Sequence, residues 1–296
     1  MKKNLDFFYN KLIEDYGRET TKGIIDGLSK KRLTTLRVNT LKSNYVDIEG
    51  IFKTNGISYE KVSWYQDAFV ITNKSEEDIQ KLDIYNDGKI YLQSLSSMLP
   101  VLVLDPKEES ILDMAAAPGS KTSQIAALSN NKSLITATEK NKIRCDRLKY
   151  NIQKQGAKKI TILNEDARKL DDFYSFDKIL LDSPCSGSGT LYLENVKNFD
   201  NELIQRCKRV QYELLEKAVK LLKVGGILIY STCSILKEEN EEIIKKILAS
   251  NDVELIPIKN DLFQNIPLLP SMNGTITVMP TKGYEGFFIA KMRKVK

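Results

Sequence analysis

Nearly continuous apolar segments alternate with helix-like segments through most of the chain, and this rhythm constrains the fold more than any other feature. The apolar segments span 110–114, 134–139, 160–166, 177–184 and 226–233. Helical patterns lie at about 119–129, 141–155, 200–223 and 237–250. Apolar strands that alternate with helices indicate a parallel sheet covered on both faces. The sequence therefore predicts an α/β fold with a doubly wound sheet, to which 253–258 and 286–292 add later strands and an antiparallel edge.

The first 90 residues follow a different pattern. Apolar residues at helical spacing predict one or two helices over residues 4–28. Strand-like runs then flank a helical stretch near 44–54, which predicts a small α+β unit; the runs are 36–41, 59–64 and 68–72. We therefore expect two domains, a helical and α+β segment at residues 1–90 and a larger α/β domain at residues 91–296.

Composition excludes several kinds of chemistry. No segment of the 296 residues approaches the roughly 18 uninterrupted apolar residues of a membrane helix. The first residues carry charges where a signal peptide needs an apolar run, so we expect a cytoplasmic protein. Histidine is absent, which removes Ser/His and Cys/His nucleophile pairs as well as histidine metal sites. The four cysteines are too widely spaced for a disulfide framework, and we expect free thiols.

Positive charge suggests a polyanionic partner. The formal net charge is +6, and basic residues cluster in three places: Lys30 to Lys42, Lys140 to Lys149, and Arg206 to Arg209. Each cluster can also be read as a solvated helix face. The first cluster, which includes Arg32, Arg37 and Lys42, is the best candidate for binding RNA, because it precedes the small α+β unit.

The segment DMAAAPGSKT, residues 113–122, joins a predicted strand to a predicted helix. Its small residues let the backbone approach a ligand, and the helix that follows points its amides at the same place. A phosphate-binding loop needs glycine where this chain has Ser120 and Ala115, and the dinucleotide fingerprint also fails. A loop with proline and a single glycine suits a cofactor without a phosphate chain, such as S-adenosylmethionine. The expected contacts are Ala115, Ala116, Ala117, Pro118, Gly119, Ser120 and Lys121.

Two acidic residues end the next two predicted strands. Glu139 closes LITATE, where a carboxylate can accept hydrogen bonds from both ribose hydroxyls of a bound nucleoside. Asp166 closes ITILNED, within range of an adenine amino group. A lone acidic residue after a strand is more often a helix cap than a ligand contact. Two of them in register beside a small-residue loop favour the cofactor interpretation.

Two cysteines follow the last two strands of the parallel series. Cys185 lies in DSPCSGSGT and Cys233 in STCS, and we expect both to face one pocket because their strands should be neighbours. Zinc is excluded, since two isolated cysteines without histidine cannot complete a tetrahedral site, whereas a redox disulfide stays open. Cys145 and Cys207 lie in helical patterns and are read as inert.

Carbon 5 of cytosine is a reaction centre that needs such a pair. It is a poor nucleophile until a thiolate adds at carbon 6, and the ring can then attack a sulfonium methyl group. The carbon 5 proton must leave afterwards so that the thiol can be released. One cysteine can attack while the other assists release, and a carboxyl group near ring nitrogen 3, for which Asp182 is placed, would support the charge changes.

These motifs resemble the Sun/RsmF-type family of RNA cytosine-5 methyltransferases. The resemblance rests on DMAAAPGSKT, LLDSPCSGSGT and YSTCSILKEENE, and LRVNTLK, YLQSLSSMLP and GYEGFFIAKMRK match its flanking segments, so it covers the chain from about residue 30. It implies a Rossmann-like class I methyltransferase fold with S-adenosylmethionine as cofactor. It also implies that Cys233 is the nucleophile and that Cys185 frees the methylated product. Asp182 would contact the base and adjoin the cofactor, and Lys121 would hold cofactor and target together.

The substrate is left open among several classes. The variant APGSKT together with SSMLP looks closest to bacterial enzymes that methylate small-subunit ribosomal RNA, which implies 16S rRNA, with tRNA as the alternative. A ribosome-assembly factor that has lost catalysis, and a methyltransferase for DNA cytosine or protein, are the competing hypotheses. DNA cytosine enzymes attack from a Pro-Cys motif, which here would mean Cys185. We expect a monomer without a metal.

Overall fold

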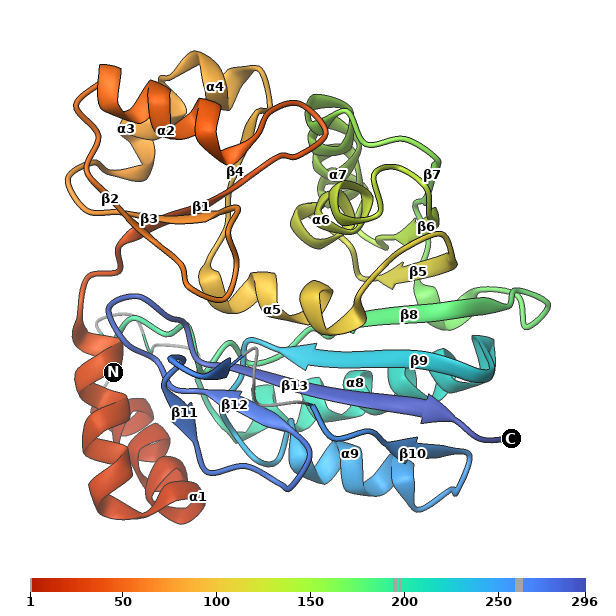
Figure 1. Cartoon of the computed structure of the whole chain (residues 1–296). Helices are drawn as coiled ribbons and strands as arrows, with labels where there is room; N and C mark the ends of the chain where they lie inside the picture. Colours follow the sequence, from red (N-terminus) through yellow and green to blue (C-terminus); the bar gives the residue numbers. More distant parts are fainter. Residues whose placement is uncertain (1, 194–195, 197–198, 259–262) are drawn as a thin grey trace. The chain divides into compact units, whose positions relative to one another are not determined.

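The computed structural model describes residues 2–193, 196, 199–258 and 263–296. These residues form two compact units (Figure 1). Unit 1 holds the described residues of 1–32, 171–259 and 266–296, and unit 2 holds those of 33–170 and 260–265. In the described part of the chain, every helix is too short or too polar to cross a lipid bilayer.

Unit 2 begins with a small antiparallel sheet. Strand β1 (Thr34–Val38) pairs with β3 (Ala68–Ile71) and with β4 (Ile90–Leu92), and β3 also pairs with β2 (Tyr59–Lys61). Figure 1 shows α2 (Tyr45–Thr54), α3 (Glu76–Gln80) and α4 (Asp83–Asn86) gathered on one side of this sheet. The apolar face of α2 is buried there because Ile48 and Phe52 pack against Leu36 and Phe69. The predicted small α+β unit is confirmed.

The second part of unit 2 carries parallel strands. Strand β5 (Ser110–Met114) pairs with β6 (Leu134–Thr138), which pairs with β7 (Ile160–Leu163), and both pairs are parallel. Helices α6 (Ser120–Leu128) and α7 (Lys142–Gln155) connect these strands, and the 3₁₀ turn η1 (Ala167–Lys169) follows β7. Helix α5 (Leu95–Leu104) was not predicted, because it is buried nearly all round and contains Pro100, so it lacks an amphipathic period.

Unit 1 is built around one parallel pair and an antiparallel edge. Strand β8 (Phe176–Asp182) is parallel to β9 (Leu222–Thr232), and β13 (Phe287–Lys294) runs antiparallel beside β9 (Figure 1). Strands β10 (Val253–Leu255) and β12 (Ile276–Val278) pair with β13, and β11 (Leu268–Leu269) pairs with β12. Helix α8 (Asn201–Leu221) packs on β8 and β9. The predicted antiparallel edge is confirmed, whereas β11 and β12 are too short for a sequence pattern to show them.

Helix α1 (Lys2–Ser29) supports the segments that follow β8 and β9. It is one helical span with a kink at Gly17, whose φ of 75° departs from helical geometry, in agreement with the predicted one or two helices. Phe8 lies edge-to-face on Phe199, with the ring centroids 5.0 Å apart, and Tyr16 donates from its hydroxyl to the Ile235 carbonyl oxygen at 2.5 Å. The apolar side of α1 therefore backs the chain just beyond Cys233.

One predicted helix starts later than its sequence pattern indicated. The prediction was 237–250, but α9 spans Glu241–Leu248, and residues 237–240 form a turn. Glu239 and Asn240 are fully buried in that turn. A run of charged residues usually marks a solvated helix face, so the pattern KEENEE gave the wrong start.

Candidate active site

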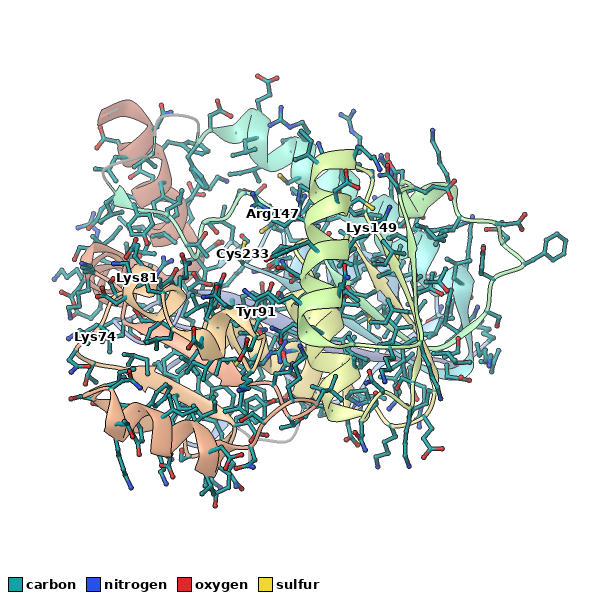
Figure 2. All side chains as sticks on the ribbon, turned by 90° about the horizontal axis from the view of Figure 1, so that it is seen from above. Lys74, Lys81, Tyr91, Arg147, Lys149 and Cys233 are labelled. Carbon is teal, nitrogen blue, oxygen red and sulfur yellow. The ribbon has the colours of Figure 1, made fainter. Side chains whose placement is uncertain are left out.

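The two cysteines of the predicted pair meet in unit 1. Cys185 follows β8 by three residues and Cys233 follows β9 directly, and the parallel register places Asp182 beside Ser231. Parallel strands end at the same edge of a sheet, which is why the two loops converge. The Sγ atoms lie 3.1 Å apart, and both cysteines are half-buried (Cys233 is labelled in Figure 2). The two thiols are therefore neighbours at one edge of the sheet, and neither forms a disulfide.

Electrostatics distinguishes Cys185 within this pair. Its hydrogen bond to Cys233 and its burial raise the pKa of the Cys185 thiol well above the ordinary value, and the nearby Glu239 charge adds to the effect. Cys185 therefore keeps its proton at neutral pH and can donate it to the sulfur of Cys233.

Asp182 lies at the end of β8 beside the same edge. Its carboxylate Oδ1 accepts a hydrogen bond from the Ser231 hydroxyl at 2.8 Å, which fixes the side chain across the β8–β9 pair. The carboxylate is half-buried, so part of it faces solvent. A positioned carboxylate three residues before Cys185 can accept a hydrogen bond from a ring N–H or an exocyclic amine.

The other two cysteines lie in helices, as their sequence patterns predicted. Cys145 is fully buried in α7. Cys207 is half-buried in α8, and burial raises the pKa of its thiol to about 11. A thiol with that pKa is almost entirely protonated at neutral pH, which suits an inert residue. Among the described residues, no group of three or more His, Cys, Asp or Glu side chains is arranged to hold a metal ion.

The loop between β5 and α6 has the backbone features of a close-approach turn. Ala115 has a φ of 58° and Gly119 a φ of 101°, and the Ala117–Pro118 peptide bond is cis. A Cβ at Gly119 would lie 2.9 Å from Leu148 Cδ1, so both the conformation and the packing require glycine there. Ala116 and Ala117 are buried against α7. The loop is therefore held rigidly, and the α6 N-terminus opens beside it.

Glu139 is built into unit 2 with half of its carboxylate unused. The residue is buried, and Oε1 accepts from the Asn141 backbone N–H at 2.8 Å. Oε2 is buried too and has no hydrogen-bond partner, although Arg144 Nη1 lies 3.5 Å from it. A buried acceptor without a donor is costly. The two hydroxyls of a ribose would satisfy it, so this residue fits the nucleoside part of S-adenosylmethionine.

Asp166 is more fully occupied than Glu139. It caps η1 by accepting from the Arg168 backbone N–H at 3.1 Å, and its Oδ2 accepts from Arg168 Nη2 at 2.5 Å. The hydrogen bond from the Arg168 side chain lowers the pKa of the Asp166 carboxyl. Asp166 is thus a helix cap in this structure, and its contact with adenine stays a prediction that would share the carboxylate with Arg168.

Lys121 is buried in the first turn of α6. Its Nζ donates to Ser97 Oγ at 2.8 Å, which ties the first turn of α6 to α5. Lys121, the small-residue loop, Glu139 and Asp166 belong to unit 2, whereas Asp182 and the two cysteines belong to unit 1. The structure brings each set together within its own unit, and a joint site of the two sets stays a prediction.

The basic cluster before residue 43 is partly buried, so its prediction as an RNA-binding surface is wrong for Arg37. Arg37 is fully buried, and it donates to Gln93 Oε1 at 2.8 Å, to the Ser120 carbonyl oxygen at 3.1 Å and to Ser123 Oγ at 2.6 Å. It therefore joins β1 to the start of α6 and presents no charge to RNA. Arg32 forms an ion pair with Glu285, so it too has a partner within the protein. The prediction failed for Arg37 because this residue lies in the buried strand β1, and an arginine in a sequence gives no sign that it is buried.

Two family models match successive parts of this chain. "16S rRNA methyltransferase RsmB/F" matches residues 101–293, and "Methyltr_RsmF/B-like, ferredoxin-like domain" matches residues 6–76. The first match alone covers more than half of the sequence. The chain therefore belongs to the RsmB/F family of methyltransferases, as the motifs indicated.

Named relatives and solved structures agree with this assignment. A 28S rRNA (cytosine-C(5))-methyltransferase of Mus musculus is 35% identical over 98% of this chain and 38% of its own length. Ribosomal RNA small subunit methyltransferase F of Shewanella loihica is 36% identical over 88% of this chain and 56% of its own length. The chain thus spans roughly half the length of these relatives.

The structural matches extend over whole chains. A methyltransferase homologue from Pyrococcus horikoshii has a TM-score of 0.83 at 34% identity, covering 97% of this chain and 99% of that one. NSun6 from the same organism, solved with SFG, an analogue of S-adenosylmethionine, has a TM-score of 0.86 at 26% identity, covering 100% and 98%. The predicted Rossmann-like methyltransferase fold is confirmed.

Proposed function

We propose that this protein transfers a methyl group from S-adenosylmethionine to carbon 5 of a cytosine in RNA, through a transient bond between the ring and Cys233. The observation that carries the proposal is the pair of sulfur atoms 3.1 Å apart at the ends of β8 and β9. Carbon 5 methylation needs a nucleophile and a separate group for release, and two adjacent thiols supply both. Membership of the RsmB/F family supports the same reaction.

The first step assigned to the protein is attack by Cys233. After its proton has passed to solvent, the Cys233 sulfur adds as a thiolate to carbon 6 of the cytosine, and the electrons of the carbon 5–carbon 6 double bond become available at carbon 5. Asp182, held by Ser231, would stabilise the base at nitrogen 3 or at the exocyclic amine. When bound, S-adenosylmethionine supplies an electrophilic methyl group that carbon 5 can attack.

Release of the product follows from the properties of Cys185. Once the Cys233 sulfur is bonded to carbon 6, the hydrogen bond that keeps the proton on Cys185 is lost, and the pKa of the Cys185 thiol falls. Cys185 can then give its own proton to solvent water, and the resulting thiolate can accept the carbon 5 proton. The electrons of that C–H bond restore the ring double bond, and the carbon 6–sulfur pair returns to Cys233.

The cofactor would be held by unit 2. The backbone of the loop from Ala115 to Ser120 fits the methionine part, Glu139 the ribose and Asp166 the adenine. Glu139 Oε2 supports this assignment most directly, because it is buried beside Arg144 but accepts no hydrogen bond, and a buried acceptor of that kind needs donors. In the proposal, Lys121, in the first turn of α6, helps to hold the cofactor and the target base.

The proposed RNA contacts in unit 2 are basic and aromatic side chains around α7. Arg147 and Tyr150 lie on its exposed side, and Figure 2 shows Tyr91 of β4 beside the helix that carries Arg147 and Lys149. Asn151 of α7 donates to the Tyr91 hydroxyl at 3.4 Å, which joins the two elements. Exposed cations next to aromatic rings favour phosphate contacts and base stacking.

The target RNA is proposed by similarity. The bacterial relatives are named as small-subunit rRNA methyltransferases, which favours 16S rRNA over tRNA. A protein that methylates bacterial ribosomal RNA is expected in the cytoplasm. We also expect it to be a monomer. The test is to incubate the protein with labelled S-adenosylmethionine and separated 16S rRNA, 23S rRNA and tRNA, followed by mapping of 5-methylcytosine. Label in a single cytosine of 16S rRNA is expected, and label in tRNA alone would favour the alternative. A protein that binds the cofactor but labels no nucleic acid would support the inactive assembly factor.

Glu139 gives a prediction for cofactor affinity. Glu139→Gln replaces the charged acceptor, and a hydrogen bond to a charged group contributes about 1.5–3 kcal/mol, so the Kd for S-adenosylmethionine should rise about 10- to 100-fold. Titration calorimetry measures this directly. Glu165→Gln is the matched control, because Glu165 is an exposed carboxylate at the end of the next strand. Equal affinity for the wild type and Glu139→Gln would remove Glu139 from the ribose site.

A further inference from the structure

A second buried acid lies between the two cysteine-bearing loops. Glu239 has no exposed surface, and its carboxylate accepts hydrogen bonds from four donors. The Ser186 backbone N–H donates at 2.8 Å and the Gln211 amide at 3.1 Å to Oε1, while the hydroxyls of Ser186 and Ser234 donate to Oε2 at 2.5 and 2.6 Å. The residue thus contacts the immediate neighbours of both Cys185 and Cys233.

The groups around Glu239 suit a carboxylate, because the serine hydroxyl next to it has to donate its proton to Glu239. Ser188 Oγ accepts from the Ile235 N–H at 2.9 Å, so its own proton is free to go to Ser234 Oγ, 2.8 Å away. Ser234 Oγ also accepts from the Leu236 N–H at 3.1 Å. With both lone pairs of Ser234 used, its proton is directed to Glu239. All the groups that face the carboxylate are therefore donors.

The same network fixes the backbone on either side of the thiols. The Gln211 amide that reaches Glu239 also donates to the Pro184 carbonyl oxygen at 3.0 Å, one residue before Cys185. The Gly189 N–H donates to the Cys233 carbonyl oxygen at 3.0 Å. Each cysteine is thus held through its neighbours in the chain. Glu239 binds Ser186 and Ser234, and the Gly189 N–H joins the Cys185 loop to the Cys233 carbonyl oxygen.

We propose that Glu239 is a positioning residue that joins the Cys185 loop to the Cys233 loop and fixes the distance between the two sulfur atoms. It does not touch the reacting atoms. This role rests on the proposed function, in which Cys233 attacks the ring and Cys185 serves release of the product, so that the two sulfur atoms must be held close together. Placing the two groups to within about 1 Å matters because misplacement of that size can cost about 100-fold in rate.

The test compares Glu239→Gln with Glu238→Gln. In Glu239→Gln the amide oxygen can accept from the Ser186 N–H and the Gln211 amide, and the NH₂ group then faces the Ser186 and Ser234 hydroxyls. Both lone pairs of Ser234 Oγ are used, so at least the hydrogen bond to Ser234 is lost and the two loops are held less firmly. Glu238 is the adjacent carboxylate, but it pairs with Lys11 and Lys208. We expect Glu239→Gln to lower kcat for RNA methylation about 100-fold with little change in the Kd for S-adenosylmethionine, and Glu238→Gln to stay near the wild type.

A second measurement reads the sulfur–sulfur distance without RNA. Diamide takes two electrons and two protons from a pair of neighbouring thiols and leaves a disulfide, so the rate of Cys185–Cys233 bond formation, followed by mass spectrometry, reports their proximity. Glu239→Gln should oxidise about tenfold more slowly than the wild type. If that variant does not fold, Ser186→Ala, which removes a single donor, should show a smaller decrease of the same kind.

The two measurements separate the possible failures. A folded Glu239→Gln protein that oxidises at the wild-type rate overturns the positioning role, whatever its activity. If the wild type methylates no RNA, the proposed function fails, whereas slower oxidation in Glu239→Gln still supports the role of Glu239 in holding the thiols together.

Discussion

Replacement of Cys233 by serine is expected to lower methyl transfer to RNA by about four orders of magnitude or more, to the background rate. The hydroxyl of serine is ionised far less readily than a thiol, and the structure offers no histidine to activate it, because the chain contains none. Transfer of label from S-adenosylmethionine to RNA at saturating substrate measures the loss. The Kd for the cofactor should be unchanged, since the proposed cofactor contacts lie in unit 2.

Cys207→Ser is the control for this experiment. Cys207 is a half-buried thiol of α8 that the mechanism does not use, so its loss should leave activity within about twofold of the wild type. A Cys233→Ser protein with full activity would show that the nucleophile is elsewhere. If activity depended on Cys185 alone, the chemistry would resemble that of DNA cytosine enzymes instead.

Replacement of Cys185 by serine is expected to have a different and equally large effect. Attack by Cys233 and methyl transfer can still proceed, but the group that accepts the carbon 5 proton is missing, so the protein stays bonded to the RNA. A band of protein plus RNA should appear on a denaturing gel when Cys185→Ser is incubated with RNA and S-adenosylmethionine, with turnover reduced about 1,000-fold.

The double variant supplies the control for trapping. Cys185→Ser combined with Cys233→Ser should form no band, because the sulfur that makes the bond is then absent. A band that persisted in the double variant, or a Cys185→Ser protein that turned over at the wild-type rate, would contradict the division of roles between the two thiols.

The parallel strands, the small α+β unit and the neighbouring thiols could be predicted from the sequence because each leaves a local signal. Continuous apolar runs marked β5 to β9, and the residues just beyond β8 and β9 had to share one edge of the sheet. The placement of Cys185 next to Cys233 follows from that register alone. The close-approach turn at Gly119 could likewise be predicted from the small residues of the loop.

Features that depend on tertiary contacts could not be read in the same way. Glu239 lies in the run KEENEE, which looks like a solvated helix face, yet it is buried by donors from residues 28 to 53 positions earlier and from the adjacent loop. Arg37 looked like part of a basic surface, but its acceptors come from β4's flank and from α6. Neither burial has a periodic signature, and helix α5, which is buried nearly all round, has none either.

Ser188 shows how a single residue gains meaning from the structure. Nothing in the sequence indicated a role for it. In the fold it is fully buried. Its hydroxyl accepts a hydrogen bond from the Ile235 N–H and forms another with the Ser234 hydroxyl. The hydroxyl, which serine and threonine share, is the part that the network uses.

The bond between one sulfur atom and the pyrimidine ring can be captured directly. RNA carrying 5-fluorocytidine at the methylated position has no carbon 5 proton to lose, so the wild-type protein should remain attached after methyl transfer. Proteolysis and mass spectrometry of the adduct should locate the modified nucleotide on Cys233. Attachment at Cys185, or fully active protein that forms no adduct with this RNA, would contradict the account.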